Sequence, residues 1–163
     1  MFVNPGNHKK IYQDLSKDYS AIETPTWSLL LAESCRSVGY SVAILDACAE
    51  RLTDEQCVER IKEANPRLIC FVVYGQNPNS GTVNMSGTVV MASAIKKANI
   101  DIPIAIVGSH VQALPFETLE NEKDIDIVFT NEGVYALRNL LKHKNLTDVS
   151  VLQSVKGIGF RQS

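Results

Sequence analysis

Segments of small or turn-forming residues follow each of five short apolar runs, and they are where this chain could bind a ligand. Glycine lets backbone amides approach a ligand closely, and Asn and Gln side chains offer neutral donors and acceptors. These residue types indicate a binding site, and we assign no catalytic residue and no metal ligand. The candidate ligand-binding residues are Asn4, Pro5, Tyr74, Gly75, Gln76, Asn77, Gly108, Ser109, His110, Asn131, Glu132 and Gly133.

The sequence lacks the motifs that bind phosphate groups. GxGxxG does not follow the first run and GxxxxGK[ST] occurs nowhere, which argues against an enzyme that uses nucleoside triphosphates. A flavin phosphate loop would need several Ser or Thr where residues 4–9 read NPGNHK, so a small flavin protein is a weaker alternative. The third run ends in Val73 and Tyr74 rather than Asp, which excludes a phosphorelay receiver. Ser109 and His110 are adjacent, and adjacent side chains seldom face each other as a nucleophile and its base must.

Composition narrows the class of protein further. The chain has 163 residues and a formal net charge of −2, with no Lys/Arg-rich stripe, so we expect one domain with no nucleic-acid or membrane partner. Its four cysteines form no CxxC pair, which argues against a metal or cluster site and for free thiols. Free thiols, no export signal and no apolar stretch of about 20 residues predict a cytoplasmic protein.

The elements that would hold the candidate residues alternate along the chain. Apolar runs bounded by turn residues predict buried parallel strands at Met1–Val3, Ser41–Leu45, Leu68–Val73, Ile104–Val107 and Ile125–Phe129. Apolar residues at helical spacing predict helices at Trp27–Val38, Asp54–Ala64, Ser86–Ala98, Pro115–Asn121 and Val134–Lys142. Thr26 is expected to cap the first helix, and Thr53 with Gln56 to form a capping box on the second.

This alternation predicts an α/β fold with a doubly wound, five-stranded parallel sheet, flavodoxin-like or Rossmann-like. The segment Val155–Phe160 is expected to add a short extra C-terminal strand. Tyr74–Thr82, Gly108–His110 and Thr130–Gly133 are expected to be loops. Ligands of such sheets bind outside the carboxyl ends of the strands, near the switch in strand order. The candidate residues all follow predicted strands, so the fold would gather them at that edge.

Five segments in this order resemble the amino-terminal cobalamin-binding domain of cobalamin-dependent radical S-adenosylmethionine enzymes. The resemblance covers essentially the whole chain. The five segments are Gly39–Ala47 (GYSVAILDA), Asn65–Phe71 (NPRLICF), Ile104–Pro115 (IAIVGSHVQALP), Asp124–Leu137 (DIDIVFTNEGVYAL) and Val155–Arg161 (VKGIGFR). The chain departs from the family at Gly108–Ser109, where the family has Gly-Gly. It also departs at Asn131–Val134, where the family has Gly-Glu-Gly-Glu.

The resemblance implies that residues 1–163 are a single domain that binds cobalamin. It also implies a radical S-adenosylmethionine domain in cis or in trans, which alone would hold S-adenosylmethionine and a [4Fe-4S] cluster. The family's CxxxCxxC lies just beyond the last segment, so the chain would be an excised domain or a short relative without radical chemistry of its own. The Asp-x-His-x-x-Gly motif is absent, which implies base-off cobalamin with neither His8 nor His110 on cobalt.

The cofactor's nucleotide tail is expected to enter between the sheet and a helix, beside the third and fourth loops. Gly75 and Gly108 would leave room for it, so bulky residues there should abolish binding without changing stability. An interaction module of the same fold with a vestigial site is the alternative.

Overall fold

The computed structural model describes residues 1–6, 22–74 and 78–162, with side chains from residue 84 onward in the last range. Its strands form one sheet in the order β2-β1-β3-β4-β5-β6. Five strands are parallel: β1 (Phe2–Asn4), β2 (Ile44–Asp46), β3 (Ile69–Val72), β4 (Ile104–Val107) and β5 (Ile127–Phe129). The sixth, β6 (Ile158–Phe160), pairs antiparallel with β5. The predicted flavodoxin-like order and the extra C-terminal strand are therefore confirmed.

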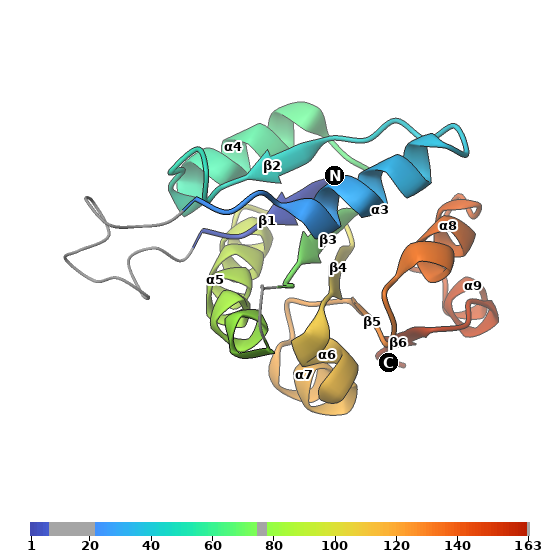
Figure 1. Cartoon of the computed structure of the whole chain (residues 1–163). Helices are drawn as coiled ribbons and strands as arrows, with labels where there is room; N and C mark the ends of the chain where they lie inside the picture. Colours follow the sequence, from blue (N-terminus) through green and yellow to red (C-terminus); the bar gives the residue numbers. More distant parts are fainter. Residues whose placement is uncertain (7–21, 75–77, 163) are drawn as a thin grey trace.

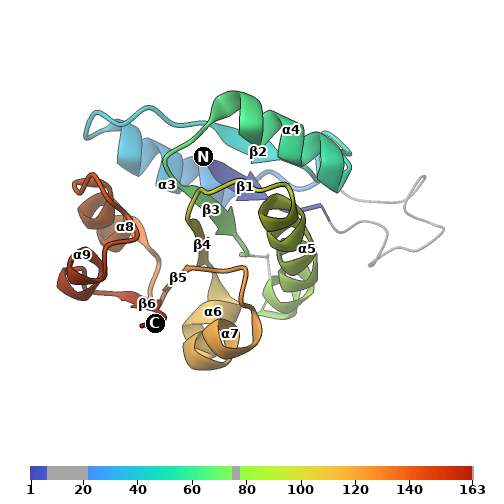
Figure 2. The same ribbon diagram turned by 180° about the vertical axis from the view of Figure 1, so that it is seen from behind.

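Helices cover both faces of the sheet (Figures 1 and 2). On one face lie α3 (Thr26–Arg36), α8 (Val134–Leu141) and α9 (Val149–Ser154). On the other face lie α4 (Asp54–Ala64), α5 (Pro78–Lys97), α6 (Ser109–Ala113) and α7 (Pro115–Asn121). Successive parallel strands need such crossover helices, and the two layers bury both faces of the sheet.

Strand β3 shows why the apolar runs do not alternate with polar residues. Ile69 and Phe71 pack into the core beside α4 and α5, whereas Cys70 and Val72 pack into the core beside α3 and α8. All four side chains are buried. A strand covered on both faces needs apolar residues at every position, which is the pattern that predicted a parallel sheet.

Helix boundaries agree with the predictions where local chemistry sets them. Thr53 Oγ1 accepts the amide of Gln56 at 3.2 Å, and Gln56 Oε1 accepts the amide of Thr53 at 2.9 Å, so the capping box is confirmed. Thr26 is not the cap of α3, because Pro25 precedes the first turn and no side chain caps it. Proline has no backbone N–H to donate. It is tolerated at the start of a helix because an N–H there would have no acceptor within the helix.

Helix α5 begins at Pro78, whereas the sequence pattern predicts its start at Ser86. The predicted third loop is correspondingly shorter, since helix replaces it from Pro78 onward. Proline suits a first helical turn, and the burial of Met85, Met91 and Ile95 against the sheet stabilises the helix despite its polar first turns. Ser109 and His110 likewise lie in α6 rather than in a loop, and α9 was not predicted.

Arg161 links the end of β6 to the segment between α7 and β5 by hydrogen bonds. Its guanidinium donates to the backbone carbonyl oxygens of Leu119 at 2.9 Å, Lys123 at 2.8 Å and Ile125 at 2.6 Å. These carbonyls belong to the end of α7 and the connection to β5. The cation therefore stabilises a helix C-terminus, where the backbone has unpaired acceptors.

Candidate functional site

The carboxyl ends of the five parallel strands share one edge of the sheet, and the first two are linked by a side-chain contact. Asn4, at the end of β1, donates its amide to Asp46 Oδ1 at 2.8 Å, at the end of β2. The same carboxylate oxygen accepts the backbone amide of Ala49 at 3.0 Å. Asn4 therefore holds two loops together, and buried Pro5 follows it.

Tyr74, the second residue after β3, has contacts from three other segments. Its ring stacks on Trp27 at the start of α3, with 4.3 Å between ring centroids and 23° between the planes. Gln112 of α6 donates its side-chain amide to the Tyr74 hydroxyl. Asn84 of α5 donates to the Tyr74 carbonyl oxygen at 3.3 Å. The residue therefore joins α3, α5 and α6 at the carboxyl edge.

Burial raises the pKa of Tyr74 to about 12, and the negative charge of Glu132 acts in the same direction. The hydrogen bond from Gln112 lowers the pKa, and its effect is the smallest of the three. The phenol therefore keeps its proton throughout the physiological pH range. Because its oxygen accepts from Gln112, that proton remains available to a ligand.

Gly108, at the end of β4, has a packing role. A Cβ at this position would lie 2.4 Å from Val73 Cγ2 and 2.6 Å from the Val73 carbonyl oxygen. Any side chain would therefore push the backbones of β3 and β4 apart at the carboxyl edge. The expectation that a bulky residue at Gly108 leaves stability unchanged is wrong. A contact of Gly108 with a ligand remains a prediction.

The loop after β5 is shaped by its own hydrogen bonds. Asn131 Oδ1 accepts the amide of Gly133 at 2.8 Å, and Gly133 precedes α8 with φ of +79°. Glycine adopts this left-handed conformation without strain. Glu132 between them is exposed, and its charge reaches Tyr74. The loop therefore carries one carboxylate whose charge acts on Tyr74.

The structure thus places Asn4 and Pro5 at one part of the carboxyl edge, and Tyr74, Gly108 and the Asn131–Gly133 loop at another. Ser109 and His110 are half-buried in the first turn of α6. Gly75, Gln76 and Asn77 lie outside the described residues.

Sequence reasoning missed Trp27, Gln112 and Asp46. One signal was available for Trp27. It is the only tryptophan of the chain, and it lies in the first turn of α3, the first described helix after β1. The start of such a helix lies at the carboxyl edge.

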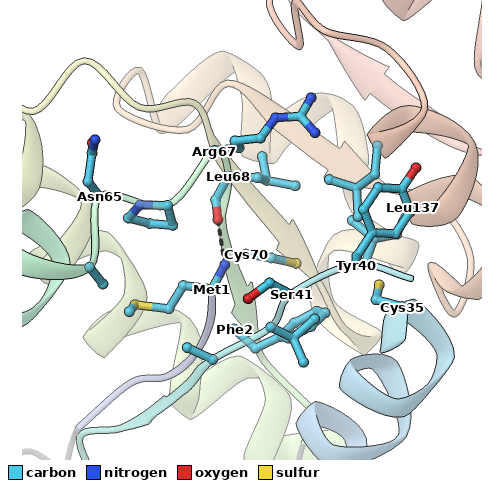
Figure 3. A pocket seen from close by; sticks show the side chains of 15 residues that line it. Met1, Phe2, Cys35, Tyr40, Ser41, Asn65, Arg67, Leu68, Cys70 and Leu137 are labelled. Atoms are coloured by element: carbon cyan, nitrogen blue, oxygen red, sulfur yellow. Dashed lines mark hydrogen bonds between the residues drawn. The ribbon is translucent and has the colours of Figure 1, made fainter. Parts of the chain in front are cut away.

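A cavity of about 340 Å³ lies at the opposite, amino edge of the sheet (Figure 3). Met1, Leu68, Cys35, Cys70 and Tyr40 are among the residues that line it, and none of the candidate binding residues does. The Met1 amine donates to the Leu68 carbonyl oxygen at 2.8 Å, and burial lowers the pKa of this amine. This cavity is therefore separate from the candidate site.

Neither a metal centre nor a membrane-spanning helix is found in the described part of the chain. Within residues 1–6, 22–74 and 78–162, no three His, Cys, Asp or Glu side chains are placed to share a metal ion. No helix in these ranges has the length and apolar character needed to cross a bilayer.

Comparison with known families decides what kind of domain this is. The family described as B12 binding domain matches residues 16–141 of the chain. The chain belongs to the B12-binding domain family. B12-binding domains take cobalamin as their ligand, so the resemblance noted in the sequence is confirmed at the level of the domain.

Two solved structures share the fold, both of the radical S-adenosylmethionine methyltransferase TsrM from Kitasatospora setae. One has cobalamin and a [4Fe-4S] cluster bound; it is 16% identical and superposes with a TM-score of 0.67 over 96% of this chain and 28% of that chain. The other has tryptophan substrate and a SAM analogue bound, with 17% identity, a TM-score of 0.67 and coverage of 96% and 27%. This chain therefore spans little more than a quarter of TsrM. No curated protein matches the sequence.

Proposed function

We propose that this chain is the cobalamin-binding domain of a radical S-adenosylmethionine enzyme and holds base-off cobalamin for methyl transfer or a related radical reaction. The observation that carries the proposal is the family match, which spans every carboxyl-edge loop except the first. The likeness to TsrM supports the choice of parent enzyme, because the shared fold there belongs to a longer chain.

The residues at the carboxyl edge suit this cofactor. They offer side-chain amides, a neutral phenol and an exposed indole, with Glu132 as a lone carboxylate among the predicted residues. Cobalamin has a largely apolar corrin ring with amide groups around its rim, and neutral amides and aromatic rings are natural partners for both parts. A mostly apolar site with a few polar groups that fix orientation is typical of cofactor binding.

Binding and orientation are what this chain's own residues would contribute. When bound, the cobalt would carry the alkyl-transfer chemistry, as cofactors generally carry the hard steps. Catalysis would need the radical S-adenosylmethionine domain in cis or in trans, since CxxxCxxC is absent from this sequence. We place the protein in the cytoplasm and expect no nucleic-acid partner.

The proposal also states that no histidine of this chain coordinates the cobalt. The sequence lacks Asp-x-His-x-x-Gly. His110 lies in the first turn of α6, half-buried, and its carbonyl oxygen accepts the amide of Leu114 at 3.0 Å. His8 lies outside the described residues. We therefore expect no imidazole of this chain to coordinate cobalt.

Reconstitution with hydroxocobalamin tests the function. The purified chain, incubated with hydroxocobalamin and desalted, should retain one cobalamin per chain with a shifted visible spectrum. Incubation with flavin mononucleotide should leave no retained chromophore. Retention of flavin alone would favour a flavin protein, and retention of neither would favour the interaction module; both results refute cobalamin binding.

Paramagnetic resonance of the bound cob(II)alamin tests its ligation. The spectrum should lack nitrogen splitting in wild type and in the variants His8→Ala and His110→Ala. Nitrogen splitting that disappears in either variant would identify a histidine ligand. Splitting that persists in both would show a nitrogen ligand other than these two imidazoles and would refute base-off, histidine-free ligation.

A further inference from the structure

We propose that Trp27 and Tyr74 form the binding surface for the lower base of cobalamin, the benzimidazole of its nucleotide tail. This inference rests on the proposed function and assigns one part of the cofactor to named residues. Trp27 was not among the residues that the sequence indicated. Its role follows from where the fold places the two rings.

The two aromatic residues stand at the switch in strand order. The order β2-β1-β3-β4-β5 reverses between β1 and β3, and ligands of doubly wound sheets bind outside the carboxyl ends of such strands. Trp27 lies in the first turn of α3, the first described helix after β1, and Tyr74 is the second residue after β3. The pair therefore lies over the reversal, with one ring from each side of it.

The stacked pair can accept a third flat ring. One side of the Tyr74 ring is taken by Trp27, and Trp27 is itself 36% exposed. Aromatic rings gain stabilisation from stacking beyond what area alone provides. Both faces of a corrin ring carry methyl groups and amide side chains, which keep a flat aromatic surface at a distance. The benzimidazole has two flat, unsubstituted faces, so it fits the pair better than the corrin does.

The Tyr74 hydroxyl adds a polar contact that suits the base-off state. In that state the benzimidazole nitrogen that could coordinate cobalt is left as a hydrogen-bond acceptor. The hydroxyl oxygen is held by Gln112, so its own proton can be donated to this nitrogen. Gln112 would then be a positioning residue that fixes the direction of the donor.

Comparison of two corrinoids tests the assignment, because cobinamide lacks the nucleotide tail. The whole chain and its variants are titrated with hydroxocobalamin and with cobinamide, and binding is followed by visible absorbance. Trp27→Ala should weaken cobalamin binding roughly tenfold, as expected for one lost stacking contact, and leave cobinamide binding unchanged. Tyr74→Phe keeps the ring and should weaken cobalamin binding several-fold, again without effect on cobinamide.

The controls distinguish a variant that has lost its fold from one that has lost only the proposed contact. Leu29→Ala alters a side chain of the same helix that is 47% exposed and makes no part of the stack, so it should leave both affinities unchanged. Circular dichroism melting of each variant confirms folding, and Trp27→Phe, which keeps a flat ring, should retain most of the affinity.

Three results would overturn the assignment, and they are distinguishable. Equal weakening of both corrinoids by Trp27→Ala and Tyr74→Phe would place the pair on the corrin. Unchanged affinity for cobalamin in both variants would place the lower base elsewhere. Failure of the wild-type chain to bind either corrinoid would refute the proposed function, and this assignment with it.

Discussion

Replacement of Gly108 by alanine should destabilise the fold strongly although it adds a single methyl group. The new Cβ would meet Val73 Cγ2 at 2.4 Å and the Val73 carbonyl oxygen at 2.6 Å. A side-chain methyl can rotate away, but a backbone carbonyl can retreat only if strand β3 moves. Over-packing of a core costs typically 1–3 kcal/mol, and the backbone contact here puts Gly108→Ala at the upper end, about 3 kcal/mol.

A loss of this size should lower the melting temperature by about 6–12 °C for a domain of this length. Thermal unfolding of the apo-protein, followed by circular dichroism, measures it. Gly6→Ala is the matched control at the same edge, because its Cβ would lie 3.5 Å from the Ala47 carbonyl oxygen, an ordinary contact. We expect that control to melt within about 1 °C of wild type. An unchanged melting temperature for Gly108→Ala would refute the packing role of this glycine.

Three further predictions concern Arg161, the cysteines and Tyr74. Arg161→Ala should lose about 2 kcal/mol of unfolding free energy in a urea titration, because backbone carbonyls at the end of α7 lose a charged donor; an unchanged midpoint would contradict this. Among the four cysteines, partly exposed Cys48 should react first with a thiol reagent at pH 8. Burial raises the pKa of Cys57 to about 11 and of Cys70 to about 12, so both should react only on unfolding; early labelling of either would contradict their burial. For Tyr74, burial raises the pKa from 10.0 to about 12, so the folded state holds a proton that the unfolded state loses. Its stabilisation is therefore complete below pH 10 and lost as the pH rises toward 12. Tyr74→Phe should flatten this part of the stability–pH curve, and an equal slope in both proteins would show that Tyr74 does not cause it.

Particular elements show how much of the fold could be predicted from the sequence alone. The bounds of α4, β4 and α7 agree with the predicted ranges, because a capping box, a short apolar run and an N-terminal proline are local signals. The strand order followed from the alternation of strands and helices, since right-handed crossovers leave few arrangements. The candidate residues that the structure describes lie at the carboxyl edge because each ends or follows a strand, and parallel strands end at the same edge.

Contacts between distant segments were decided only by the tertiary structure. The start of α5 at Pro78 depends on burial against the sheet, which local propensity does not reveal. The role of Gly108 depends on how closely the chain approaches Val73 in the neighbouring strand. The stacking of Trp27 on Tyr74 brings together residues that no sequence motif connects. Sequence periodicity reports which side of an element is buried, but distances between side chains of different elements are set by how those elements pack.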